Sequence, residues 1–146
     1  MSVLFFWVGK NYRKDLTDGS ATSYWLNQNS ELLYNLKQGE HVWAFTRKND
    51  GTYVLAADLV VKTTGKNQKG DSNYDYGIYH AIGMKTTRYF DTEKGPDAEA
   101  LIRLLSFEPQ AKTLGWSFQG RNAVRHLEHT DEKKLEEFAK NLPLIP

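Results

Sequence analysis

The chain has 146 residues, of which 40% are hydrophobic and 25% are charged, and its formal net charge is +1. These values fit one folded domain with a proper core, and they argue against disorder and against nucleic-acid binding by bulk charge. The absence of cysteine excludes disulfide frameworks, zinc ribbons, iron–sulfur centres and thiol nucleophiles. Nineteen aromatic side chains (four Trp, eight Tyr, seven Phe) are the most distinctive feature of the composition.

The first half of the chain predicts three strands and a short helix. Residues 3–8 are apolar, β-branched and aromatic, which is typical of a buried strand. Residues 9–23 are polar and contain glycine, so we expect a loop that ends at Tyr24 and Trp25. Ser30 can cap a short helix that stops at Gly39. A hairpin follows, with strands at residues 41–47 and 52–62 joined by Asn-Asp-Gly at residues 49–51.

The second half predicts a long loop, further strands and two helices. Residues 63–76 are polar and lysine-bearing and are expected to be an exposed loop, before two strands or one bent strand at residues 77–82 and 86–90. Pro96 suits the first position of a helix, and Thr130 can cap the last helix. Residues 143–146 cannot extend that helix and are expected to be either the start of a linker or the C-terminal end.

This order of elements predicts an α+β fold: a small mixed β-sheet or pseudo-barrel of five to six strands with about three helices. Residues 1–142 would form a single domain. The longest apolar run, residues 3–8, is far shorter than the roughly 20 residues of a membrane span, and no charged leader precedes it. We therefore expect a cytoplasmic protein without membrane contact.

Motifs for catalysis or metal binding are weak. Residues 65–70 have two glycines spaced as in a P-loop, but Asp71 follows where phosphate binding needs a lysine. His126 and His129 have no second ligand cluster, and the Glu-Lys-Lys sequence at residues 132–134 falls on the polar face of the last helix. We therefore expect no catalytic activity, no cofactor and no metal in this domain.

The aromatic residues divide by their surroundings. Trp7 and Trp43 lie within apolar strands and are expected in the core, whereas Trp25 and Tyr76 fall in polar loops. A flat ligand such as a nucleic-acid base gains about 1–3 kcal/mol from each stack on an aromatic ring. For Trp25 and Tyr76, a binding pocket and a core position remain equally open.

Basic residues accompany these loops. They would form a positive groove if they lay on one face, while scattered solvated charges are the alternative. They are Arg13, Lys14, Lys62, Lys66, Lys69, Lys85, Arg88, Arg121 and Arg125.

The order of features resembles the PUA-like superfamily, specifically its EVE and YTH branches. Residues 3–8 are similar to the first strand of these domains, Tyr24-Trp25 to the stretch that carries a pocket tryptophan, and residues 36–45 to a Gly-Glu step into a strand. Residues 101–105, 117–120 and 123–124 with the last helix resemble the C-terminal half of EVE domains. The likeness covers almost the whole chain through short motifs.

The resemblance implies a non-catalytic module that flips a modified base into an aromatic pocket. Such modules are found fused to prokaryotic restriction nucleases. The implied function is therefore the specificity domain of a defence protein, with a fused or associated nuclease or NTPase as partner. Modified DNA is favoured as the ligand. An RNA-binding accessory domain without modification preference is the alternative, and an enzyme acting on a small nucleotide is a third reading.

The resemblance also implies site residues. The base would be held by Trp25 as one wall, Tyr76 with Tyr74 as the opposite wall, Asn11 and Tyr12 as polar contacts, and Gln119 at the mouth. The nucleic-acid backbone would be held by Lys66, Lys69, Arg88 and Arg121. Gly-Lys-Asn-Tyr at residues 9–12 replaces the usual Lys-Ser/Thr-Glu-Pro run, and the YTH tryptophan before the fourth strand is absent, so the bound modification stays open.

Overall fold

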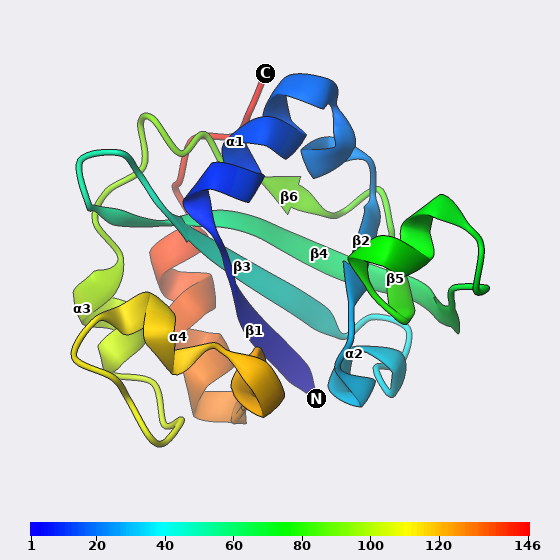
Figure 1. Cartoon of the computed structure of the whole chain (residues 1–146). Coiled ribbons are helices and arrows are strands. Elements are labelled where there is room, and N and C mark those ends of the chain that lie inside the picture. Colours follow the sequence, from blue (N-terminus) through cyan, green and yellow to red (C-terminus); the bar gives the residue numbers. More distant parts are fainter.

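A mixed seven-stranded sheet is the frame of the computed structural model, which describes residues 1–146 (Figure 1). The strands are β1 (Ser2–Trp7), β2 (Trp25–Gln28), β3 (His41–Arg47), β4 (Tyr53–Lys66), β5 (Tyr79–Gly83), β6 (Arg88–Tyr89) and β7 (Val124–Leu127). Their order is β2-β5-β4-β3-β1-β7, with β6 also paired to β4. Only β1 and β3 run parallel. The predicted α+β class with a mixed sheet is therefore confirmed.

Strand β4 connects two parts of the sheet. Its first part pairs with β3, and its last residues pair with β5 after a register shift between Val61 and Thr63. A bulge of this kind bends a strand and increases its twist. The sheet consequently curls, and Leu26 of β2 packs against the cluster that contains Phe5 of β1.

Four helices and four short 3₁₀ turns surround the sheet. The helices are α1 (Gly9–Asp18), α2 (Glu31–Tyr34), α3 (Glu99–Arg103) and α4 (His129–Ala139), and the turns are η1 (Ser20–Thr22), η2 (Ser72–Tyr76), η3 (Leu114–Ser117) and η4 (Gly120–Asn122). Figure 1 shows α3 and α4 on one side of β1 and β3, and α2 beside β2 and β5 on the other. None of the helices is long and apolar enough to cross a bilayer.

The core has two parts because successive side chains of a strand point to opposite faces. Leu4 and Trp43 belong to the cluster that packs against Leu135 of α4. Val3 and Val42, one residue earlier in each strand, belong to the cluster that is covered by α1 and α2. Trp43 is fully buried, as expected for a tryptophan in an apolar strand.

Two polar stretches predicted as loops are regular structure. Residues 9–18 form α1, which buries Gly9 and Tyr12 and ends at Gly19 with a left-handed φ of 87°. Strand β4 continues to Lys66, and Trp25 begins β2 instead of ending a loop. Packing against the sheet overrides the local polarity in both regions.

The predicted helix ends are partly right. Ser30 caps α2 by accepting a hydrogen bond from the Leu32 backbone N–H, and residues 49–51 turn the β3–β4 hairpin. Helix α3 begins at Glu99 and not at Pro96. Helix α4 begins at His129, where Glu128 and Asp131 form a capping box in place of the predicted Thr130 cap.

Residues 143–146 pair with the segment around β6. The Asp91 N–H donates to the Pro143 carbonyl at 2.8 Å, and the Ile145 N–H donates to the Tyr89 carbonyl at 2.9 Å. Leu144 forms an isolated bridge with Phe90. The C-terminal residues therefore extend the pairing next to β6.

Candidate functional site

A cavity of about 520 Å³ opens between β1, α1, β2 and η2. This volume falls within the roughly 300–1,000 Å³ of small-molecule sites, which are typically apolar with a few convergent polar groups. Its lining includes Phe5 and Trp7 of β1, Asn11, Lys14 and Asp15 of α1, all four residues of β2, and Asn73 and Tyr76 of η2. The curl of the sheet creates this cavity, since it brings β2 toward β1.

Trp25 forms a supported wall of the cavity. Its indole ring stacks on the His80 imidazole with ring centroids 4.1 Å apart and an interplanar angle of 26°. His80 in turn lies over Gly65, where an added Cβ would come within 2.7 Å of the imidazole. One face of the indole thus rests on the sheet. Trp25 remains 36% exposed, which leaves its other face available to a ligand.

Buried Asn67 holds this wall in place. Its Nδ2 donates to Asn27 Oδ1 and to the Gly77 carbonyl, each at 2.8 Å. Asn27 Oδ1 also accepts the Trp25 indole N–H at 2.8 Å. His80 Nδ1 lies 2.8 Å from Asn67 Oδ1, so in this arrangement the imidazole is the donor. Burial lowers the pKa of His80 and so favours the neutral ring.

Trp7 and Tyr76 form other parts of the wall. The Trp7 indole N–H donates to Asp15 Oδ2 at 3.2 Å, and its ring packs edge-on against Tyr12. Trp7 is half-buried: it packs against the core cluster that contains Phe5 and also lines the cavity, so the expected core position holds in part. Tyr76 is 69% exposed on η2, whose first turn is capped by Asp71.

The amide side chains that line the cavity differ in how many of their hydrogen-bonding groups are free. Asn27 is occupied by Trp25 and Asn67, and its Nδ2 donates to Asn73 Oδ1 at 3.3 Å. The side chains of Asn11 and Gln28 line the cavity without a hydrogen bond to the rest of the chain. Each amide carries both donors and an acceptor, the combination that the edge of a base requires.

Half of the predicted base-binding residues meet at this cavity. Asn11, Trp25 and Tyr76 line it together. Tyr12 does not: it is 4% exposed, because α1 turns it into the core. Neither Tyr74 of η2 nor Gln119, which precedes η4, is among the lining residues.

The predicted backbone-binding residues do not form one surface. Arg88 was misassigned, because its guanidinium is engaged by Asp58 and Glu136. The Lys66 ammonium lies over the Tyr34 ring, 5.4 Å from the centroid. The other two, Lys69 and Arg121, are exposed on separate turns.

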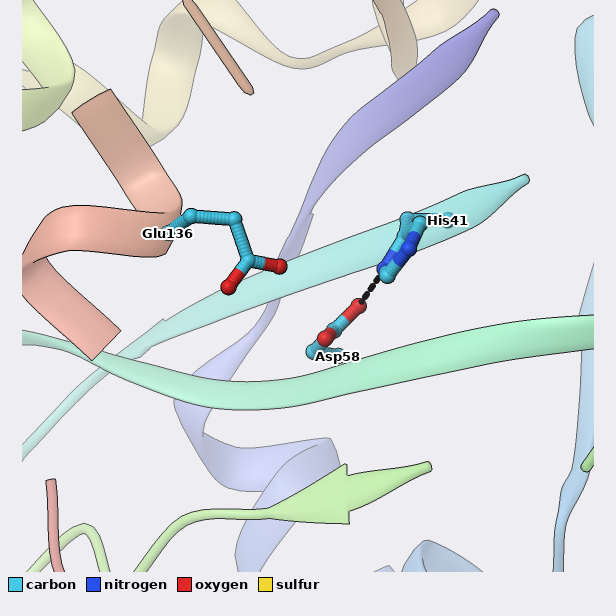
Figure 2. Close-up of side chains that lie close together, drawn as sticks. All are labelled: His41, Asp58 and Glu136. Carbon is cyan, nitrogen blue, oxygen red and sulfur yellow. Dashed lines mark hydrogen bonds and ion pairs between the residues drawn. The ribbon is translucent and has the colours of Figure 1, made fainter. Parts of the chain in front are cut away.

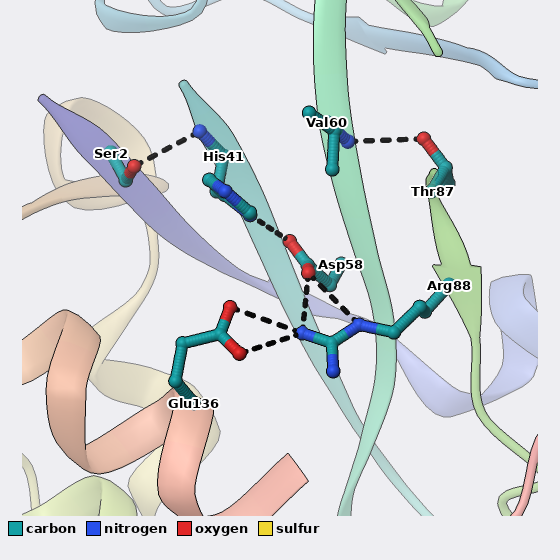
Figure 3. Close-up of polar contacts among 7 residues, drawn as sticks. All are labelled: Ser2, His41, Asp58, Val60, Thr87, Arg88 and Glu136. Atoms are coloured by element: carbon teal, nitrogen blue, oxygen red, sulfur yellow. Dashed lines mark hydrogen bonds and ion pairs between the residues drawn. The ribbon is translucent and has the colours of Figure 1, made fainter. Parts of the chain in front are cut away.

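A second cluster joins α4 to the sheet and was not foreseen. Figure 2 shows His41 of β3, Asp58 of β4 and Glu136 of α4; their ligand atoms lie within 4.8 Å of one another. Figure 3 adds Arg88, whose Nη2 donates to Asp58 Oδ2 at 2.7 Å and to both Glu136 oxygens at 3.1 Å. The guanidinium already supplies the cation between the carboxylates, so a metal ion would have to displace it.

This cluster is internally satisfied. Asp58 is 1% exposed and accepts His41 Nδ1 at 2.5 Å on one oxygen and Arg88 on the other. The hydrogen bond to Asp58 raises the pKa of His41. Two hydroxyl groups in Figure 3 add to the network: Ser2 Oγ accepts the backbone N–H of His41, and Thr87 Oγ1 accepts the backbone N–H of Val60. The arrangement is that of a structural ion-pair network, and its members are too far apart in sequence to form a motif.

Fold and cavity together define an α+β domain with an aromatic, amide-lined cavity on one side of a curled mixed sheet. Comparison with known proteins finds no family model that matches the chain and no curated protein that matches it.

Proposed function

We propose that the protein is a PUA-like nucleic-acid-binding module that recognises a modified base in DNA by holding the flipped base in the cavity. In this proposal the domain is the non-catalytic specificity part of a prokaryotic restriction or defence system. Cleavage or translocation would come from a fused or associated nuclease or NTPase.

The observation that carries the proposal is the meeting of Trp25, Tyr76 and Asn11 at one solvent-open cavity. Trp25 offers a supported aromatic face, which suits a planar ligand because stacking adds about 1–3 kcal/mol per base. Trp7 adds apolar surface, against which a substituent such as a methyl group gains about 0.8 kcal/mol per buried carbon.

The polar lining supports binding more than catalysis. Asp18 accepts hydrogen bonds from the Ser20 hydroxyl and backbone N–H, which lower its pKa and disfavour a role as general acid. Asp15 accepts the Trp7 indole N–H. The free amides of Asn11 and Gln28 are suited to reading a base edge at neutral pH.

Fluorescence anisotropy with short DNA strands tests the proposal. A set of otherwise identical oligonucleotides would carry 5-methylcytosine, 5-hydroxymethylcytosine, N6-methyladenine or no modification. The proposal expects one modified strand to bind at least tenfold more tightly than its unmodified counterpart. Equal or negligible affinity for every strand would refute it.

The Trp25→Ala variant separates this function from the RNA-binding alternative. A base pocket should lose most of its affinity for the preferred strand, because the supported stacking face is gone. A module that binds RNA through backbone charges should keep its affinity nearly intact. Parallel titration with unmodified RNA of the same sequence decides between the two.

A further inference from the structure

Helix α1 separates the aromatic cavity from a second, smaller depression of about 280 Å³. Lys14 lines the aromatic cavity, whereas Arg13, the preceding residue, lines the smaller depression. The far side of that depression is the end of β3, with Arg47 and Lys48. A molecule that extends from one hollow to the other must cross the exposed face of α1.

That face of α1 is basic. Lys10, Arg13 and Lys14 are all exposed, and their spacing of three and four residues places them on one side of the helix. Asn11, Asp15 and Asp18 are spaced by four and three residues. They form the neighbouring face of α1, which lines the aromatic cavity. Lys14 lies at the boundary of the two faces: it lines the aromatic cavity together with Asp15 and Asp18, and its charge helps to lower the pKa of Asp18.

Close packing joins this face of α1 to Arg47 and Lys48. The Arg13 guanidinium donates to the Arg47 carbonyl at 3.2 Å. Gly9 permits this contact, since an added Cβ would collide with the Arg47 carbonyl and lie 2.9 Å from Arg13 Nη1. The Arg47 side chain donates one hydrogen bond within the chain, from Nε to the Gly51 carbonyl at 3.2 Å. Four of its N–H donors stay free for an anion.

The N-terminal end of α1 adds to the positive field. Its N-cap residue, Val8, offers no side-chain acceptor, and its first turn holds no acidic residue. The positive end of the helix dipole is thus uncompensated by the chain itself. Asp50 and Glu93 also line the smaller depression. Asp50 accepts the Thr52 backbone N–H at 2.9 Å, and this hydrogen bond lowers its pKa, so Asp50 and Glu93 are both negative charges that oppose the cations of this depression.

We propose that this surface, Lys10, Arg13 and Lys14 with Arg47 and Lys48, holds the phosphodiester backbone of the strand whose base occupies the aromatic cavity. The inference rests on the proposed function, and it replaces the dispersed set of Lys66, Lys69, Arg88 and Arg121 as the backbone contact. Neutral overall charge is no obstacle, because a local stripe beside the pocket is sufficient.

Salt dependence of DNA binding tests the surface. The probe is a fluorescein-labelled single-stranded 12-mer with one modified base, the one preferred in the anisotropy series, or 5-methylcytosine if no preference is found. Each neutralised phosphate contributes about 0.7 to the slope of log K against log salt for single strands. Removing three contacts should reduce that slope by about 2. Between 50 and 200 mM salt, the variant should then lose about 20-fold less affinity than the unmodified protein.

The test variant is Lys10→Gln, Arg13→Gln, Lys14→Gln. The matched control is Lys133→Gln, Lys134→Gln, Lys140→Gln, which removes two exposed charges from α4 and one from its C-cap residue. The double variant Lys10→Gln, Lys14→Gln keeps the Arg13–Arg47 contact and should give about two thirds of the effect. It answers the question even where loss of Arg13 disturbs folding. The Arg47→Gln, Lys48→Gln pair should reduce the slope further.

The outcomes separate the two proposals. A slope unchanged in the α1 variant, or equally reduced in the α4 control, overturns the backbone surface while leaving base selectivity intact. A reduced slope without any preference among the modified strands supports the surface and overturns modified-base recognition. Absence of binding to every strand at 50 mM salt overturns both.

Discussion

The aromatic cavity and the cluster around Asp58 are both polar sites on the same sheet, but they differ in what remains unpaired. Asp58 is 1% exposed, and its two oxygens are taken up by His41 and Arg88. In the cavity, the Asn11 and Gln28 amides have no partner in the chain, and Trp25 keeps an exposed indole face. A network whose hydrogen-bonding groups are all paired stabilises the fold. A ligand needs unpaired donors and acceptors and an exposed ring face.

The difference warns against judging a site by the types of residue that it contains. A histidine with two carboxylates has the composition of a metal-ligand set. Here Arg88 pairs with both carboxylates, which makes the group an ion-pair network. The cavity has no such motif, yet it presents a supported ring and free amides around an open volume. The comparison predicts that damage to the cluster reduces stability, while damage to the cavity reduces binding.

The largest expected effect is the loss of stability in Asp58→Ala. The change leaves the half-buried His41 side chain without its acceptor and leaves Arg88 with Glu136 alone, and breaking a buried ion pair in this way costs about 3–5 kcal/mol. Urea denaturation measures it, with Glu136→Gln as the control. Glu136 is exposed, so its loss should cost less than about 1 kcal/mol. Similar small losses in both variants would show that the buried Asp58 charge is not a major source of stability.

The next largest effect is on binding in Trp25→Ala. Loss of one stack should weaken affinity for the preferred strand by about 1–3 kcal/mol, which is roughly 5- to 150-fold. Trp25→Phe should retain part of that affinity. Trp116→Ala is the matched control, because Trp116 is 68% exposed and lies outside the cavity. Equal losses in the Trp25 and Trp116 variants would mean that the cavity is not the binding site.

The elements that the sequence predicts well are those whose local signals agree with packing. The β3–β4 hairpin has an Asn-Asp-Gly turn and apolar strands on both sides, and Ser30 caps α2. Helix α1 was missed because its cap is Val8 and only Gly9 and Tyr12 are buried, so neither a capping signal nor an apolar stripe marks it. Strand β2 was missed because it lies at the sheet edge, where its polar residues face the cavity.

The residues of the candidate site also differ in how well the sequence marks them. Trp25 and Tyr76 could be selected because aromatic rings in polar surroundings need a reason to be there. Gln28 and Asn67 could not, since nothing in the sequence tells which of many amides is left free and which is buried. The misassignment of Tyr12 follows from missing α1, because a helix directs that residue inward where a loop would expose it.

Asn67 offers a change that should affect both properties, each moderately. Asn67→Ala removes the donor to Asn27 and Gly77, and leaving such buried groups unpaired costs about 1–2 kcal/mol of stability. Binding should weaken by less than in Trp25→Ala, because the indole loses its orientation and not its surface. Anisotropy and urea denaturation on the same samples measure the two effects.

The Asn67→Asp variant is the isosteric control for this position. Its carboxylate still accepts from His80, but it faces the Asn27 and Gly77 oxygens without a donor. The pKa of His80, lowered in the native protein by burial, should rise beside the new negative charge. A histidine NMR titration follows that shift. An unchanged His80 pKa and unchanged affinity would show that Asn67 does not position Trp25.

The smallest expected effect is a pH dependence of stability that comes from His41. The Asp58 hydrogen bond raises the folded-state pKa of His41, assisted by the negative charges of Glu136 and Glu132 and opposed by burial. Folding therefore favours the protonated ring, so this stabilisation is complete below the ordinary pKa near 6.5 and is lost as pH rises through the folded-state pKa. One proton limits the slope to about 1.4 kcal/mol per pH unit. The stability difference between the unmodified protein and His41→Gln, measured in urea from pH 5.5 to 9, should shrink as pH rises. A stability difference that stays constant or grows with pH would show that Asp58 stabilises the fold through Arg88 and not through protonated His41. The contribution of the cluster would then be independent of pH in this range.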